Sequence, residues 1–324
     1  MPQKVIDGNK FEVLDAREYM SIPDCFVLRN KTGTGHGEAK FYVGNENRET
    51  MGFFDNFDRE CFFLRSDFEK YLEDAALEYN HPEQKYKNIK DLPADWKTYK
   101  KEIAAIRNEI IPFSIYRVRV VPPRVYINSR DKIYTFLRRV ALPGISYLSA
   151  LKLRAADGEI KYYFRLFIDY FYLGTEDHPF EVRREEKEIE AARSIQTEGK
   201  EQLIRARMGQ GRYREELLRE CPYCLITGVS DERFLRASHI KPWIRSSNEE
   251  RLDPKNGLML TPTYDFLFDK GFISFGDNGV LLVSPWISPM NQRRLGLSPG
   301  KRYRFEWSGR ELYLKYHREN IFKR

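Results

Sequence analysis

The segment from residue 221 to residue 271, CPYCLITGVSDERFLRASHIKPWIRSSNEERLDPKNGLMLTPTYDFLFDKG, constrains this chain more than any other. His239 lies in a short, apolar-flanked run over 237–240 that predicts a strand. Asn256 follows after a polar stretch rich in Ser, Asn, Glu and Asp, which predicts a loop. One imidazole and one amide are thus placed at the two ends of a single strand-and-loop unit.

A short helix is predicted over 264–270, directly after that unit. Thr263 is a suitable N-cap residue, and Gly271 suits the position just beyond the C-terminal end. Asp265 and Asp269 are four residues apart, so a helix places both carboxylates on one face. The pair forms an oxygen-rich half-site for a hard metal ion.

These side chains fit the hydrolysis of a phosphodiester. A divalent ion held by oxygen ligands carries a phosphate oxygen and neutralises charge on the leaving oxygen, while a neutral histidine takes a proton from the attacking water. Asn256 does not ionise, so we expect it to hold the loop or the imidazole by hydrogen bonds. Taken singly, a histidine on an apolar strand is usually a core residue and two aspartates at helical spacing are usually a solvated face.

The segment resembles the HNH endonuclease family, which has the ββα-metal fold. Four ordered blocks carry the resemblance: Cys-x-x-Thr-Gly at 224–228, Ala-x-His-Ile-x-Pro-Trp at 237–243, Asn-Gly-Leu at 256–258 and Leu-Phe-Asp-x-Gly at 267–271. Upstream, residues 209–214 are similar to the Gly-Gln-x-x-Phe-Arg block that often precedes this core, and 313–317 are similar to the family's closing segment. The resemblance covers roughly the last third of the chain.

The resemblance implies a role for each matching residue. His239 corresponds to the general base, Asn256 to the loop-fixing asparagine, and Asp265 with Asp269 to the metal ligands. Position 265 is commonly the final histidine of the motif. An aspartate there is a harder ligand, which favours Mg²⁺ or Mn²⁺ over zinc or nickel. Ser238 occupies a position where some members place another ligand, so the metal is expected to be held loosely.

The cysteines do not predict a disulfide scaffold. Cys221 and Cys224 have the spacing of half a zinc site, but no second pair and no suitably placed histidine complete four ligands. We therefore interpret both as buried or reduced thiols.

Basic residues gather in two stretches of a chain whose formal net charge is +7. In 101–139 they are interleaved with tyrosines and a phenylalanine, which is typical of a surface that contacts phosphate and stacks on bases. Arginine alternation on a half-buried strand gives the same pattern without any ligand. The arginines that we predict to bind nucleic acid are Arg117, Arg119, Arg124, Arg138 and Arg139 in this stretch, and Arg205, Arg207, Arg212 and Arg214 before the nuclease core.

The predicted fold class is α+β, in three parts. Residues 1–180 form a mixed α+β recognition or sensor domain, 181–204 a charged helical connector with few apolar positions, and 205–324 the nuclease domain. Within the first part we expect a helix after Pro143 and a strand in which Ile160 and every second residue to Tyr170 line one face.

The sequence thus predicts a metal-dependent endonuclease that acts on double-stranded DNA, of restriction or phage-defence type. The N-terminal domain would choose the site by caging a flipped modified base, or would sense a nucleotide signal or a protein partner. The alternative is an HNH-fold DNA-binding protein with weakened catalysis. A single HNH domain cuts one strand, so a double-strand break suggests a homodimer. Because the sequence contains no long apolar segment and no signal peptide, we expect a cytoplasmic protein without a membrane partner.

Overall fold

The computed structural model describes residues 3–34, 38–45, 48–54, 59–121, 124–170, 178–191 and 211–324. Contacts along the chain divide it into two compact units, Met1–Glu181 and Val182–Arg324. Both units combine helices and strands, so the fold class is α+β, as expected. In the part of the chain that is described, no helix is long and apolar enough to cross a membrane.

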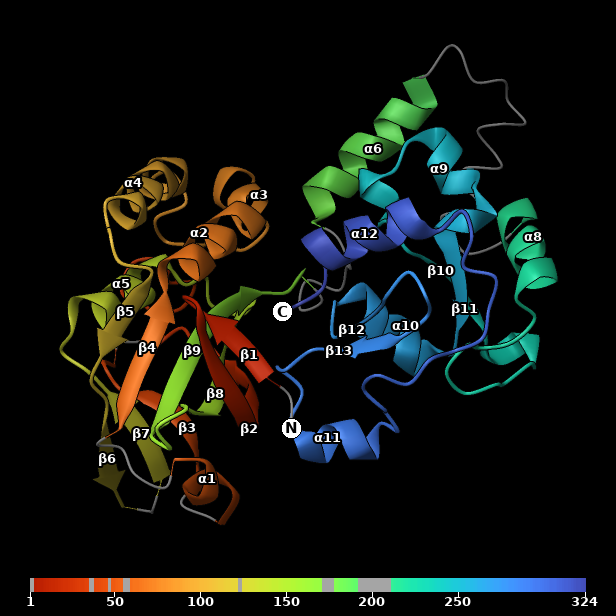
Figure 1. Cartoon of the computed structure of the whole chain (residues 1–324). Helices are drawn as coiled ribbons and strands as arrows, with labels where there is room; N and C mark the ends of the chain where they lie inside the picture. The colour runs from red at the N-terminus through yellow and green to blue at the C-terminus, as the bar shows by residue number, and fades with distance from the viewer. Residues whose placement is uncertain are drawn as a thin grey trace. The chain divides into compact units, whose positions relative to one another are not determined.

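A six-stranded sheet forms the centre of the first unit, in the order β1-β2-β8-β9-β4-β5 (Figure 1). Neighbouring strands are antiparallel except β4 and β9, which are parallel. The strands are β1 Gln3–Ile6, β2 Asn9–Ser21, β4 Glu60–Leu64, β5 Ile110–Phe113, β8 Ser146–Arg154 and β9 Ile160–Ile168. A separate three-stranded sheet has the order β3-β7-β6, with β3 Phe41–Asn45, β6 Tyr116–Val120 and β7 Arg124–Asn128.

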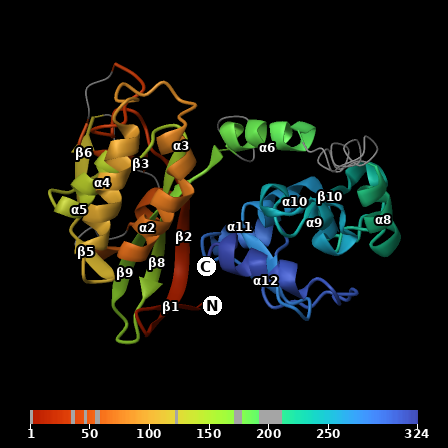
Figure 2. The same ribbon diagram turned by 90° about the horizontal axis from the view of Figure 1, so that it is seen from above.

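Helices cover the six-stranded sheet of this unit, and α2 contacts β9 and β4 directly (Figure 2). The helices are α1 Arg48–Phe53, α2 Arg65–Asp74, α3 Ala76–Asn80, α4 Leu92–Ala104 and α5 Lys132–Val140. Tyr162, Phe164 and Leu166 of β9 lie in the core beneath them, which confirms the predicted apolar face. Tyr163 and Phe167 are also buried and stack on Phe62 and Tyr147, so β9 is covered on both faces.

The helix expected after Pro143 is wrong, because Ser146–Arg154 forms strand β8. This strand pairs with β2 on one side and with β9 on the other, in the middle of the sheet. Its residues from Ser146 to Leu151 are all buried. A strand that is covered on both faces loses the alternation of apolar and polar residues by which a strand is distinguished from a helix.

The second unit contains the ββα arrangement. Strands β10 Arg236–His239 and β11 Gly257–Leu260 pair antiparallel, and helix α10 Pro262–Asp269 contacts both (Figure 1). The other elements are β12 Ile273–Phe275, β13 Leu281–Val283, α8 Arg212–Glu220, α9 Asn248–Leu252, α11 Pro289–Arg294 and α12 Glu311–Asn320. Leu258, Met259, Leu260 and Phe268 are fully buried and join β11 to α10 in one apolar core.

The predicted connector begins with helix α6, Pro179–Ala191, while residues 192–204 lie outside the described ranges. The helix is highly charged, as expected, yet Glu185 is buried. From Val182 onward the helix belongs to the second unit. Its low apolar content is offset there by polar contacts, which hydrophobic periodicity does not reveal.

Candidate active site

The end of strand β10 holds His239, which pairs in register with Gly257 of β11. The ring of Tyr213 from α8 lies parallel to the imidazole, with centroids 4.4 Å apart and an interplanar angle of 8°. Trp243 meets the imidazole at 83°, with centroids 5.5 Å apart. Nε2 of His239 lies 3.0 Å from the backbone carbonyl oxygen of Arg251. Two aromatic rings and a hydrogen bond therefore fix the orientation of this imidazole.

The hydrogen bond sets the tautomer of His239. A carbonyl oxygen only accepts, so Nε2 carries the proton and Nδ1 holds the lone pair. The pKa of His239 is lowered to about 4, chiefly because burial disfavours the imidazolium; the hydrogen bond to Arg251 acts in the opposite direction. At neutral pH this side chain is an uncharged imidazole with Nδ1 as its basic atom.

Gly257 explains why a glycine follows the asparagine in the Asn-Gly-Leu block. A Cβ atom at this position would lie 2.4 Å from the hydroxyl oxygen of Tyr213 and 2.7 Å from Cδ2 of Leu217. Both atoms belong to α8. The absence of a side chain lets α8 approach β11 closely enough for Tyr213 to stack on His239.

Asn256 is fully buried and holds the loop between the two strands. Its Oδ1 accepts from the backbone N–H of Lys241 at 2.8 Å, and its Nδ2 donates to the carbonyl of Glu250 at 3.0 Å and to Ser246 Oγ at 3.3 Å. The next carbonyl after Glu250 is that of Arg251, which receives the imidazole N–H. Asn256 thus fixes the loop directly, and the imidazole only through that loop.

Helix α9 gives this loop its shape. Ser247 caps the helix, and Ser247 and Glu250 form a complete capping box. Nζ of Lys241 lies 2.6 Å from Oε2 of Glu250 across the loop. The capping box fixes the residue at which α9 begins, and this places the Arg251 carbonyl within hydrogen-bond distance of the imidazole.

Helix α10 begins two residues earlier than predicted, with Thr261 and not Thr263 as N-cap residue. Pro262 occupies the first helical position, where its missing N–H costs nothing. The helix ends at Asp269, one residue before the predicted end, and Gly271 lies just beyond the C-cap as predicted. Gly271 has a φ of +69°, and the N–H groups of Gly271 and Phe272 donate to the carbonyls of Phe268 and Leu267 in the Schellman pattern.

Both predicted carboxylates project from α10 and contact β10. Ser238 Oγ lies 3.4 Å from Oδ1 of Asp269, and Nε of Arg236 lies 3.9 Å from Oδ2 of Asp265. Arg236 and Ser238 are two residues apart and share one face of β10, whereas His239 follows Ser238 and points to the other face. The pKa of the Tyr213 hydroxyl is raised well above its usual value, first by burial, and the charges of Asp269 and Asp265 add to this rise. The carboxylates therefore act electrostatically on the ring that stacks on His239.

The donor set at α10 suits a hard cation that keeps part of its water shell. Among the described residues, no group of three or more His, Cys, Asp or Glu side chains is arranged to hold a metal ion. Two carboxylates, with the hydroxyl of Ser238 beside that of Asp269, are of the ligand type that Mg²⁺ and Mn²⁺ take, since these ions are often bound by one or two carboxylates, water and substrate phosphates.

Cys221 and Cys224 are free thiols in the core of this unit, both fully buried. Burial raises the pKa of Cys221. Sγ of Cys224 lies 3.8 Å from Thr261 Oγ1, next to the start of α10. Their positions are those of packed core residues.

The arginines predicted before the nuclease core are only partly described. Arg205 and Arg207 lie outside the described residues, and of Arg212 only the backbone at the start of α8 is described. Arg214 donates to the backbone carbonyls of Glu232 at 2.8 Å and Leu235 at 3.1 Å. It ties α8 to the segment that enters β10.

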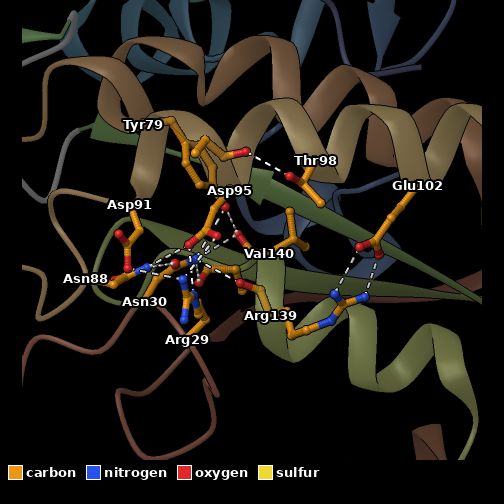
Figure 3. A network of polar contacts seen from close by, with 12 residues as sticks. Arg29, Asn30, Tyr79, Asn88, Asp91, Asp95, Thr98, Glu102, Arg139 and Val140 are labelled. Atoms are coloured by element: carbon orange, nitrogen blue, oxygen red, sulfur yellow. Dashed lines mark hydrogen bonds and ion pairs between the residues drawn. The ribbon is translucent and has the colours of Figure 1, made fainter.

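Two arginines of the predicted basic stretch serve the first unit itself. Arg138 is buried and donates from Nε to the carbonyl of Phe26 at 3.0 Å. Arg139 makes two hydrogen bonds with the carboxylate of Glu102 on α4, as Figure 3 shows. The backbone of Arg139 also accepts a hydrogen bond from the buried Asn30, which extends the network of Figure 3. These two guanidinium groups hold α5 in place.

The other predicted arginines of that stretch lie on the three-stranded sheet. Arg124 is exposed at the start of β7. Arg117 and Arg119 are paired in β6 with Ile127 and Val125, and their side chains are not described. Tyr42 and Tyr126 are cross-strand partners with ring centroids 5.4 Å apart, and Tyr42 and Tyr116 are among the exposed aromatic side chains. Arg124 is two residues from Tyr126, so both lie on the same face of the sheet.

Four residues that support the site were not predicted as functional. Tyr213 and Trp243 pack on the imidazole, the backbone carbonyl of Arg251 accepts its N–H, and Glu185 contacts Arg251. The block over 209–214 was a signal for Tyr213. Sequence spacing gives no signal for Arg251, because this residue acts through its backbone carbonyl. It gives none for Glu185, because Glu185 lies 54 residues before His239.

Comparison with known proteins finds one family model that matches the sequence around this site. The model of a family described as HNH endonuclease matches residues 224–276, which span β10, β11 and α10. No curated protein matches the chain. The C-terminal unit thus contains an HNH endonuclease domain, which indicates nuclease activity on nucleic acid.

Proposed function

We propose that this chain, with its C-terminal HNH domain, is a metal-dependent endonuclease that hydrolyses phosphodiester bonds of double-stranded DNA. The observation that carries the proposal is the state of His239: a neutral imidazole, oriented by Tyr213, Trp243 and the Arg251 carbonyl, with its lone pair on Nδ1. A half-buried imidazole kept uncharged at neutral pH suits a base that takes a proton from water.

Each residue of the site has a proposed role in the reaction. His239 accepts the proton of the attacking water on Nδ1, and Asn256 keeps the loop that orients it. Asp265 and Asp269 would hold Mg²⁺ or Mn²⁺ beside Ser238, the residue before the base. When bound, the ion supplies Lewis-acid stabilisation of the phosphate and the leaving oxygen. Because Ser238 and His239 are consecutive residues of β10, the half-site and the base would both lie at the end of this strand.

The first unit would choose where the nuclease cuts, and the face of the three-stranded sheet supports this proposal. Tyr42, Tyr116 and Tyr126 accompany the exposed Arg124 there, and stacking side chains beside a cation suit nucleic acid. A nuclease with a separate reader fits a restriction or phage-defence system, including one that reads a modified base. A nucleotide signal or a protein partner is the other kind of ligand proposed for this unit. A double-strand break would need two copies of the domain.

The test is cleavage of supercoiled plasmid in Mg²⁺ or Mn²⁺, with and without chelator. Unmodified, cytosine-modified and adenine-methylated plasmids should be compared in parallel. Nicked and linear products that vanish with chelator support the proposal, and a preference for one plasmid supports a modification-reading first unit.

A DNA-binding protein with weakened catalysis is the second candidate, because no group of three ligating side chains is present in the described ranges. Tight DNA binding without cleavage in any metal would favour it. Absence of both binding and cleavage would contradict the two candidates alike.

A further inference from the structure

A buried carboxylate on helix α6 lies behind the candidate site. The side chain of Glu185 is 5% exposed and that of its partner Arg251 is 9% exposed. Oε1 of Glu185 is 2.8 Å from Nη2 of Arg251. The indole N–H of Trp243 donates to the same carboxylate oxygen. A buried ion pair is stable only when its geometry is good and further hydrogen bonds satisfy both charged groups. Removal of one member leaves the charge of the other buried and unpaired.

Both partners of Glu185 touch His239. Trp243 packs its ring against the imidazole at 83°, and the backbone carbonyl of Arg251 accepts the Nε2 proton. Glu185 is therefore linked to the imidazole by two routes, one through an indole ring and one through a backbone carbonyl.

The guanidinium group of Arg251 donates to two neutral oxygen atoms and forms an ion pair with the carboxylate of Glu185. Its Nε donates to the carbonyl of Trp243 at 3.0 Å, and its Nη1 donates to Asn248 Oδ1 at 2.9 Å. Its guanidinium lies 4.9 Å from the centre of the Trp243 ring. The oxygens of Trp243 and Asn248 are neutral, so Glu185 supplies the negative charge of this cluster and joins Arg251 to Trp243 as a shared acceptor.

We propose that Glu185 of α6 is a positioning residue for the general base: it fixes Arg251 and Trp243, and through them the orientation and tautomer of the His239 imidazole. The proposal rests on the proposed function, because it gives His239 the role of base. It makes the part of α6 that belongs to the second unit a support for the candidate site of the HNH domain. Glu185 lies 39 residues before the start of the family match at residue 224 (224 − 185).

A kinetic comparison on the full chain tests the proposal. Glu185→Ala should lower kcat for plasmid cleavage by about 10- to 100-fold, because misplaced catalytic groups cost about this much. KM for DNA and the Mg²⁺ concentration for half-maximal rate should stay as in the wild type, since no phosphate or metal contact is removed. Glu185→Gln keeps an oxygen acceptor for both donors and should restore most of the rate.

The control removes another arginine-paired carboxylate of the same unit, one whose side chain is exposed. Asp277 lies 2.7 Å from Nη2 of Arg318, near the β12–β13 ladder. Asp277→Ala should leave kcat unchanged. Thermal unfolding of every variant shows whether a loss of rate exceeds a loss of folded protein.

A spectroscopic measurement tests the positioning itself. The chain has five histidines, so ¹⁵N-histidine labelling and long-range ¹H–¹⁵N spectra resolve each tautomer, with His239→Ala assigning the signal. Wild-type His239 should be the Nε2–H tautomer, and Glu185→Ala should shift it towards a mixture. His317 is the internal control, because its Nε2 lies 3.0 Å from the carbonyl of Phe268 in a different part of the unit.

The outcomes separate this proposal from the proposed function. A Glu185→Ala protein with wild-type kcat and an unchanged His239 signal overturns it. Equal disturbance of His239 and His317 also overturns it, because that result shows general loosening. If the wild type does not cleave DNA, the proposed function fails, and the His239 signal of the Glu185 variants still decides whether Glu185 positions the imidazole.

Discussion

The phenol ring of Tyr213 lies parallel to the imidazole of His239, with centroids 4.4 Å apart. The contact depends on Gly257, where any side chain would collide with the Tyr213 hydroxyl. That hydroxyl donates to the carbonyl of Asn256 at 3.3 Å. Tyr213 therefore connects the residue proposed as base with the residue that fixes the loop.

Tyr213→Phe should cleave DNA at close to the wild-type rate, because it keeps the stacked ring and loses one net hydrogen bond of about 1 kcal/mol. Tyr213→Ala should lower kcat markedly, since the imidazole loses the ring that supports one of its faces. Single-turnover cleavage rates of the two variants check this prediction. Equal rates for both would mean that the ring does not support the base.

His239→Ala should reduce cleavage by about 10²- to 10⁴-fold, the usual effect of losing a general base. DNA binding in chelator should stay near wild type, because no phosphate contact is deleted. Fluorescence anisotropy and single-turnover assays measure the two quantities. His81→Ala changes an exposed imidazole of the first unit and serves as the control. A His239→Ala enzyme as fast as wild type would remove His239 from the reaction.

Asp269→Asn should raise the Mg²⁺ concentration needed for half-maximal cleavage, because an amide is a poorer ligand than a carboxylate for a hard cation. Asp265→His should shift the preference towards softer ions such as Ni²⁺ or Co²⁺. Cleavage titrations with each metal measure both effects. Asp277→Asn is the control for an aspartate away from the site. Unchanged metal profiles in both variants would show that these carboxylates are surface residues.

The stability of the second unit should fall as the pH is lowered from about 6.5 to about 4. Burial lowers the pKa of both His239 and His317 to about 4 in the folded chain, below the usual value of about 6.5 when unfolded. In this window the unfolded state binds more protons than the folded state, so acidification favours unfolding.

The effect is at most about 3.5 kcal/mol for each histidine, at about 1.4 kcal/mol per pKa unit. Urea unfolding at a series of pH values measures it. His317→Gln should flatten the pH dependence by removing one of the two groups. An identical slope in this variant would show that His317 is not neutral in the folded state.

A fragment of residues 200–324 should be less stable and less active than a fragment of residues 178–324. The shorter fragment lacks α6 and leaves Arg251 without Glu185, and breaking a buried pair of this kind costs about 3–5 kcal/mol. The longer fragment should nick DNA in Mn²⁺, with a loss of binding as salt rises. Thermal unfolding and plasmid nicking compare the two.

Equal stability and activity in both fragments would contradict the role of α6. A fragment with the substrate preference of the full chain would show that specificity lies in the HNH domain and not in the first unit.

The sequence alone predicted the HNH domain of the C-terminal unit and its candidate site residues, because these residues are close together in the chain. The four predicted site residues lie within 31 consecutive positions, from His239 to Asp269. This segment forms a strand, a loop, a second strand and a short helix, and the local spacing of its residues predicts the first strand, the loop and the helix. The C-terminal end of α10 was also local, since Gly271 adopts the left-handed conformation that ends the helix. The start of α10 was missed because Thr261 and Thr263 are both suitable caps; Pro262, which suits the first helical position, was the sequence signal for Thr261.

Tertiary structure decided what holds those residues in place. Packing of α8, α9 and α6 brings Tyr213, Arg251 and Glu185 to the site. The periodicity of a sequence does not predict a hydrogen bond to a backbone carbonyl or a buried ion pair between distant segments. The same reason explains β8, which is buried on both faces, and Arg138 and Arg139, whose charges are used inside the first unit. Local sequence specifies which groups can react, whereas long-range packing specifies which charges remain available and how the reacting groups are oriented.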